Sequence, residues 1–101
     1  MSSDGDHFFA PPAFKPAEAL QRLQRELRAL GLSERAGTFE RQGLACVQAT
    51  AGDGVLNVAL AKAPARTPQW QPRTLKDSAQ LRDFIAAVKQ QLARHDERSS
   101  E

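Results

Sequence analysis

The segment Ala51-Gly52-Asp53-Gly54 separates two apolar runs, Leu44 to Thr50 and Val55 to Ala61. An Asp-Gly pair tolerates the left-handed backbone conformations that a tight turn between antiparallel strands requires. The pattern therefore predicts a β-hairpin in the middle of the chain, and this hairpin limits the folds that the rest of the sequence can adopt.

Alternation within the second run indicates which face of the hairpin is buried. Leu56, Val58 and Leu60 fall on one face because side chains of a strand point alternately to its two sides. These three residues are large and apolar, so we expect them to face a second layer. The opposite face is small and mixed, and it consists of Val55, Asn57, Ala59 and Ala61. That face could be solvated, covered by another segment of the chain, or used for dimerisation.

Two amphipathic helices are predicted, one on each side of the hairpin. The first begins at Pro16, a residue suited to the first helical position, and ends at Gly31, with Leu32 packing back on Leu27. The second begins at a cap formed by Thr74 with Asp77 or by Asp77 with Gln80, and runs to about Arg94. Their apolar stripes are Leu20, Leu23, Leu27 and Leu30 in the first, and Leu81, Phe84, Ile85, Val88 and Leu92 in the second.

Two further strands complete the prediction. Phe39 to Gln42 forms a short strand before a turn or a bulge at Gly43. Gln69 to Thr74, which contains Pro72, is suited only to the edge of a sheet. The fold class is therefore α+β: a two-layer sandwich in the order helix, three or four antiparallel strands, helix, with both helices on one sheet face. We expect a single domain over 16–94, an N-terminal tail over 1–15 and a disordered C-terminal tail over 95–101.

Length, charge and cysteine content narrow the class of protein. A chain of 101 residues has room for one domain, and its longest apolar runs are far shorter than the roughly 18 residues that cross a bilayer. The first fifteen residues contain acids and prolines and no secretory signal pattern. Cys46 is the single cysteine, so no intrachain disulfide can form. We expect a soluble cytoplasmic protein without a membrane association.

The N-terminal tail contains three of the five phenylalanines, Phe8, Phe9 and Phe14, interleaved with prolines. A purely solvated tail would have little use for three large apolar rings. The tail either folds back over the domain or docks on another chain, and folding back requires less ordering entropy than association does.

Residues that could carry catalysis are few. Both histidines, His7 and His95, lie in the predicted tails, tyrosine is absent, and Cys46 lies in a predicted strand where a buried thiol is expected. The sequence contains neither the paired cysteines and histidines of a structural zinc site nor a phosphate-binding glycine loop. We therefore expect a protein that is not an enzyme, with no catalytic residue, no metal ligand and no cofactor.

A nucleic-acid site is the alternative that the charges suggest. Residues 16–94 contain 12 basic and seven acidic residues, a net charge of +5. Stacking on an aromatic ring beside cations is the physical basis of single-strand binding. The candidate residues are Arg66, Trp70, Arg73 and Lys76, with help from Arg22 and Arg25 on the first helix.

The sequence thus predicts a non-enzymatic domain that acts by protein–protein contact, with a protein partner or a second copy of the chain in a homodimer. Either the small, mixed face of the hairpin or the N-terminal segment with Phe8, Phe9 and Phe14 could meet the partner. Weak binding of nucleic acid through the Arg66/Trp70/Arg73/Lys76 loop is the competing hypothesis, and salt dependence separates the two.

Overall fold

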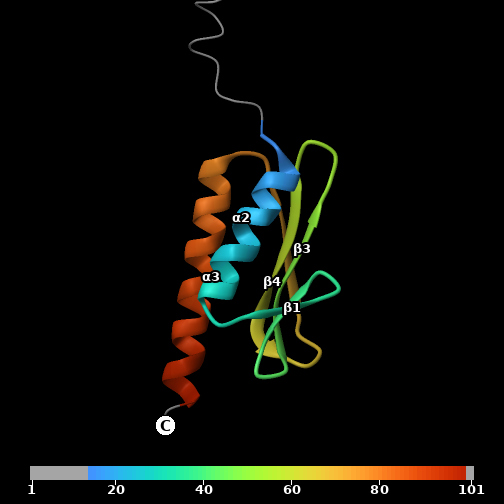
Figure 1. Ribbon diagram of the computed structural model, residues 1–101. Helices are drawn as coiled ribbons and strands as arrows, with labels where there is room; N and C mark the ends of the chain where they lie inside the picture. The colour runs from blue at the N-terminus through green and yellow to red at the C-terminus, as the bar shows by residue number, and fades with distance from the viewer. Residues whose placement is uncertain (1–13, 100–101) are drawn as a thin grey trace, which may run out of the picture.

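A computed structural model describes residues 14–99 of the chain, and it shows two helices packed on one face of a five-stranded antiparallel sheet (Figure 1). The helices are α2 (Pro16–Ala29) and α3 (Ser78–Ser99). The strands lie between them in the chain and are β1 (Ser33–Arg35), β2 (Thr38–Arg41), β3 (Leu44–Ala51), β4 (Leu56–Ala65) and β5 (Trp70–Leu75).

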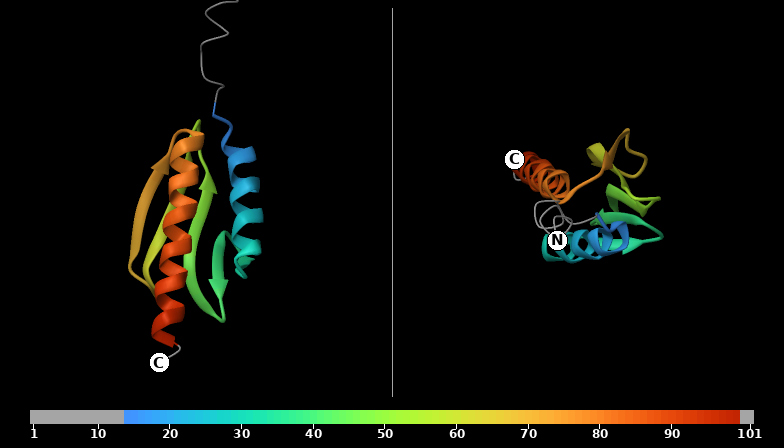
Figure 2. Two further views of the ribbon diagram at one scale, coloured as in Figure 1. Left: turned by 90° about the vertical axis from the view of Figure 1, so that its left-hand side faces the viewer. Right: turned by 90° about the horizontal axis from the view of Figure 1, so that it is seen from above.

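The sheet is a simple meander in which every strand pairs with its neighbours in sequence, in the order β1-β2-β3-β4-β5. An odd number of antiparallel strands separates the two helices, so α3 begins at the same end of the molecule as α2. Figures 1 and 2 show the consequence: α2 and α3 run in the same direction, and their N-terminal ends lie together at one end of the sheet.

The predicted fold class is confirmed, with differences in the number and length of the elements. The sheet has five strands because Ser33–Arg35, for which no strand was predicted, pairs with β2. Strand β4 continues to Ala65, beyond the predicted end at Ala61. Helix α3 continues to Ser99, so the predicted end near Arg94 was too early, and residues 95–99 are helical.

The end of α2 follows the predicted glycine cap. Gly31 has φ of +89°, and its N–H donates to the carbonyl of Arg28. The N–H of Leu32 donates to the carbonyl of Leu27 over 3.0 Å, which closes a Schellman motif. Leu32 is only 4% exposed, so the cap also returns the chain to the core.

Of the two predicted starts for α3, the one at Asp77 is confirmed. The carboxylate Oδ1 of Asp77 accepts a hydrogen bond of 2.8 Å from the N–H of Gln80. The side-chain Oε1 of Gln80 in turn accepts from the N–H of Lys76, at 2.7 Å. These two bonds form a variant of the capping box, displaced by one residue at its second bond, and they satisfy donors at the helix start. Thr74, the other candidate cap, lies within β5.

The core fills the space between the helices and the inner face of the sheet. As the alternation predicts, Leu56, Val58 and Leu60 belong to this core. The turn before them is the predicted hairpin: the N–H of Gly52 donates to the carbonyl of Val55, and Gly54 has φ of +71°. The fully buried side chains include Leu23 and Leu27 of α2, Phe39 and Val47 of the sheet, and Phe84 and Val88 of α3.

A bulge explains why β4 is longer than predicted. Val47 of β3 pairs with Leu60, whereas Ala45 pairs with Ala65, so residues 61–64 lie opposite Cys46 alone. Such an excursion leaves backbone groups without ladder partners. Gln91 of α3 supplies the missing donor, because its Nε2 donates to the carbonyl of Ala61 over 3.0 Å and also to that of Lys62.

Candidate functional site

The sheet face opposite the helices, here called the outer face, is the first of two candidate surfaces. No element of residues 14–99 covers it, as the view along the helices shows (Figure 2). The strand register places on it Gln48, Thr50, Asn57, Ala59, Ala61, Trp70, Pro72 and Thr74. It is therefore mostly uncharged, with one large aromatic ring.

Trp70 is partly exposed at the start of β5 and lies directly opposite Ala61 of β4. The Cβ atoms of directly opposite residues in antiparallel strands are about 4.5–5.5 Å apart, so the side chain of Trp70 begins next to that of Ala61, which is 1% exposed. Trp70 thus keeps part of its surface toward solvent beside a buried alanine.

A shallow hollow of about 420 Å³ adjoins Trp70 on the outer face. The β4–β5 loop forms one wall of it and strands β1 to β3 form the other. Within it, Nη2 of Arg35 lies 3.3 Å from Oε1 of Glu40, so one cation is paired. The lining residues are Arg35, Thr38, Glu40, Ala45, Gln48, Arg66, Thr67, Pro68 and Trp70.

The four residues of the predicted nucleic-acid loop are not brought together. Arg66 and Trp70 share the hollow on the outer face. Arg73 pairs with Val58, a core residue, so it points to the helix side, and its guanidinium carbon lies 6.0 Å from the ring centre of Phe84. Lys76 follows β5 at the start of α3, where it lines a different surface.

The three phenylalanines also differ in what the structure describes. Phe8 and Phe9 lie outside the described residues. Phe14, which was assigned to the tail, is partly buried and packs against the hydrophobic core. The described part of the fold therefore includes two residues before α2.

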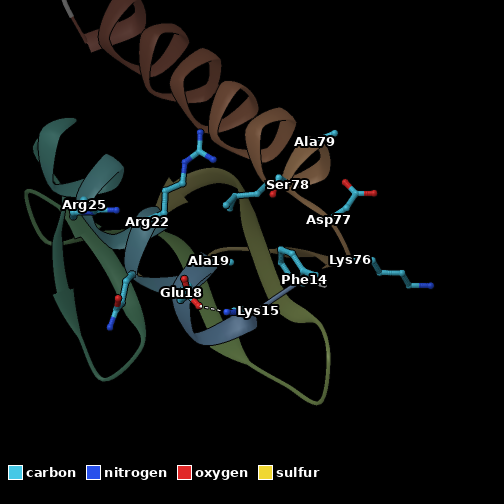
Figure 3. Close-up of a pocket in the computed structure, with 12 residues that line it drawn as sticks. Phe14, Lys15, Glu18, Ala19, Arg22, Arg25, Lys76, Asp77, Ser78 and Ala79 are labelled. Carbon is cyan, nitrogen blue, oxygen red and sulfur yellow. Dashed lines mark ion pairs between the residues drawn. The ribbon is translucent and has the colours of Figure 1, made fainter. Parts of the chain in front are cut away.

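The second surface is a groove between the N-terminal parts of α2 and α3, here called the α2–α3 groove, with a volume of about 890 Å³ (Figure 3). Sequence reasoning missed it because it depends on the two helices starting at the same end of the sheet. Its lining residues come from Phe14 to Arg25 and from Lys76 to Leu81. Among them, Phe14, Ala19, Ala79 and Leu81 give it an apolar part.

The charges of the α2–α3 groove are only partly compensated. Nζ of Lys15 lies 3.5 Å from Oε2 of Glu18, and Asp77 caps α3. Figure 3 shows Lys76 and Asp77 extending away from the groove, whereas Arg22 reaches toward α3. Within residues 14–99, no ion pair is formed by Arg22 or by Arg25.

The thiol of Cys46 is buried, and three carboxylates form ion pairs with arginines. Cys46 is a free thiol, 1% exposed, and its Sγ lies 3.3 Å from the carbonyl oxygen of Leu44. Burial raises the pKa of the Cys46 thiol, and this outweighs the lowering by the backbone N–H and charge of Arg41. Three carboxylates pair with arginines: Glu34 with Arg28, Glu40 with Arg35, and Asp96 with Arg41.

Residues 14–99 contain no cluster of three or more histidine, cysteine, aspartate or glutamate residues that could hold a metal ion. Neither helix described here is long and apolar enough to cross a membrane. Comparisons of the chain with protein-family models, with curated proteins and with solved structures found no significant match.

Proposed function

We propose that the protein is a non-enzymatic domain that acts by protein–protein contact, and that the outer face of its sheet is the contact surface. The observation that carries this proposal is the partly exposed Trp70 on a sheet face that no described element covers. Tryptophan is enriched at the centres of protein interfaces because a large ring gains much from losing its remaining water contact.

The charge of the outer face supports a protein partner over a polyanion. Arg35 is already paired with Glu40, whereas Arg66 forms no ion pair with any residue that the structure describes. The remaining residues around Trp70 are small or uncharged, such as Gln48 and Pro68. A surface of this kind fits another protein surface, whereas affinity for nucleic acid depends on several phosphate contacts.

The partner that we propose is a second copy of this chain. Two outer faces stacked on each other would form a sheet-on-sheet sandwich with a spacing of about 10 Å, and both Trp70 rings would be buried in it. The structural surroundings of Cys46 and of the paired carboxylates fit a non-catalytic role. A free thiol fits the cytoplasmic location that we also propose.

Sedimentation velocity over a range of protein concentrations tests this proposal. We expect a monomer–dimer equilibrium, with Trp70 fluorescence shifting to shorter wavelength as the dimer forms. Trp70→Ala should shift the equilibrium to the monomer. Gln71→Ala is the matched control, because Gln71 is the next residue of β5 and pairs with the core residue Leu60 on the other face. A chain that stays monomeric at all concentrations, or a Trp70→Ala variant that dimerises like the wild type, would contradict the proposal.

Binding of single-stranded nucleic acid is the second candidate, and the position of Arg66 beside Trp70 favours it. A fluorescence titration of Trp70 with a mixed oligonucleotide at about 50 mM and about 200 mM salt tests it. Quenching that weakens with salt would support this function, and Trp70→Ala should then reduce binding by about 1–3 kcal/mol per lost stack. No change in fluorescence at either salt concentration would exclude stacking on this ring.

A further inference from the structure

The α2–α3 groove opens at the point where the N-terminal segment joins the described fold. Phe14 is the first described residue, and it both lines the groove and packs against the core. The residues before it therefore begin at the rim of a hollow of about 890 Å³. The groove lies on the helix side of the molecule, so it is separate from the outer face.

The groove and the N-terminal segment before Phe14 carry side chains of opposite charge. Arg22 and Arg25 line the groove without an ion pair among residues 14–99, and Figure 3 shows Arg22 reaching across toward α3. Residues 1–13 contain Asp4 and Asp6 and no lysine or arginine. Opposite charges of this kind attract over about 10 Å at moderate ionic strength.

The groove and the N-terminal segment also both carry apolar side chains. The groove offers the ring of Phe14 together with Ala19, Ala79 and Leu81. The segment carries Phe8 and Phe9 directly after its acidic residues. A phenylalanine side chain gains free energy when it leaves water, and burial of two such side chains offsets part of the entropy lost when the segment becomes ordered.

The reach of the chain is also sufficient. Arg22 and Arg25 lie six and nine residues after Pro16, or about 9 Å and about 14 Å along the helix axis. A reversal through Pro11 to Ala13 would bring the two phenylalanines back over the apolar part. Asp6 and Asp4 precede Phe9 by three and five residues. An extended chain of that length spans about 10–17 Å, which is the distance from Phe9 that the two carboxylates can reach.

We propose that the α2–α3 groove is the binding site for residues 4–9 of the same chain. Phe8 and Phe9 cover the apolar part beside Phe14, and Asp4 and Asp6 pair with Arg22 and Arg25. This intramolecular contact is independent of the proposed function, because it uses the helix side of the molecule.

Amide chemical shifts of the full chain test the proposal. Phe8→Ala combined with Phe9→Ala should shift the amide signals of Ala19, Arg22 and Ala79 and leave those of Gln48 and Asn57 on the outer face unchanged. Ser2→Ala combined with Ser3→Ala is the matched control in the same segment and should shift none of them. A second variant, Arg22→Gln combined with Arg25→Gln, should make the signals of Phe8 and Phe9 insensitive to added salt, whereas in the wild type these signals move with salt.

Each result decides the question. Groove shifts that do not depend on protein concentration support the intramolecular contact. Groove shifts that appear only at high concentration would assign the segment to the groove of a second copy and overturn it. Identical groove signals in the wild type and the phenylalanine variant would show that the segment does not occupy the groove.

Discussion

Among single residues, Phe84 of α3 is part of the core between this helix and the sheet. Its ring is fully buried, and the guanidinium carbon of Arg73 lies 6.0 Å from the ring centre. Phe84→Ala would leave a cavity that the surrounding helices and strands can fill only in part. We expect a loss of about 3–5 kcal/mol in the free energy of unfolding, measured by urea denaturation.

Lys89→Ala is the control for this substitution because Lys89 is exposed on the same helix. It should change the free energy of unfolding by no more than about 0.5 kcal/mol. Equal effects at the two positions would mean that Phe84 does not anchor α3 to the sheet.

Because of Cys46, we expect the free energy of unfolding to depend on pH in the alkaline range. Burial raises the pKa of its thiol above the ordinary value of 9.0, so the folded state favours the protonated form. Its contribution to stability is complete below that value and is lost as the pH rises through the folded-state pKa. The difference in unfolding free energy between the wild type and Cys46→Ala should therefore be constant up to about pH 8 and fall above about pH 9. A difference that does not change with pH would show that the thiol titrates alike in both states.

Trp70 and Arg73 show which part of the site the sequence could have indicated. An edge strand was predicted over 69–74, and the structure has it one residue later, at Trp70–Leu75. Two residues three apart in a strand point to opposite faces. The predicted strand alone therefore places Trp70 and Arg73 on opposite faces of the sheet. The pairing of Trp70 with Ala61 and the hollow beside Arg66 depend instead on strand register, which a bulge shifts between Ala45 and Val47.

At the scale of elements, the end of α2 depends on one backbone conformation. Gly31 has φ of +89°, and a methyl group added there would meet no atom within 4 Å. Gly31→Ala would therefore strain the backbone without creating a steric clash. We expect it to reduce the free energy of unfolding by about 1–2 kcal/mol. Gly31→Asn should lose less, because asparagine adopts left-handed conformations more readily. Urea denaturation of both variants measures this, and an alanine variant as stable as the wild type would contradict it.

The elements that the sequence predicts well are those whose apolar residues repeat regularly. The leucine stripe of α2 and the alternation of Leu56, Val58 and Leu60 are confirmed because burial of one face imposes these periods. Strand β1 has no such signal, since Ser33, Glu34 and Arg35 are all exposed. It forms because β2 offers it a free edge, and no local pattern records that contact.

At the scale of the whole molecule, the two layers should unfold together. The core is one cluster to which α2, α3 and strands β2 to β5 all contribute, so neither layer buries its apolar face alone. Trp70 reports on the sheet, and far-ultraviolet circular dichroism at the helical band reports mainly on α2 and α3. We expect the two urea transitions to have the same midpoint and slope. A fluorescence transition that precedes the loss of helix would show that the sheet can open while the helices remain.

Pro72 has a consequence for how copies of this molecule can meet. The backbone N–H of Lys62 donates to the carbonyl of Gln69. Along an antiparallel ladder, hydrogen-bonded residue pairs alternate with pairs that are not hydrogen-bonded. The pair of Pro72 with Ala59 is therefore not hydrogen-bonded, and the proline nitrogen points to the free edge, where it removes a donor. At the opposite edge, β1 is only three residues long and carries two charges. Both rims of the sheet thus resist fibril-like growth by strand addition, so copies of this molecule are not expected to join edge to edge.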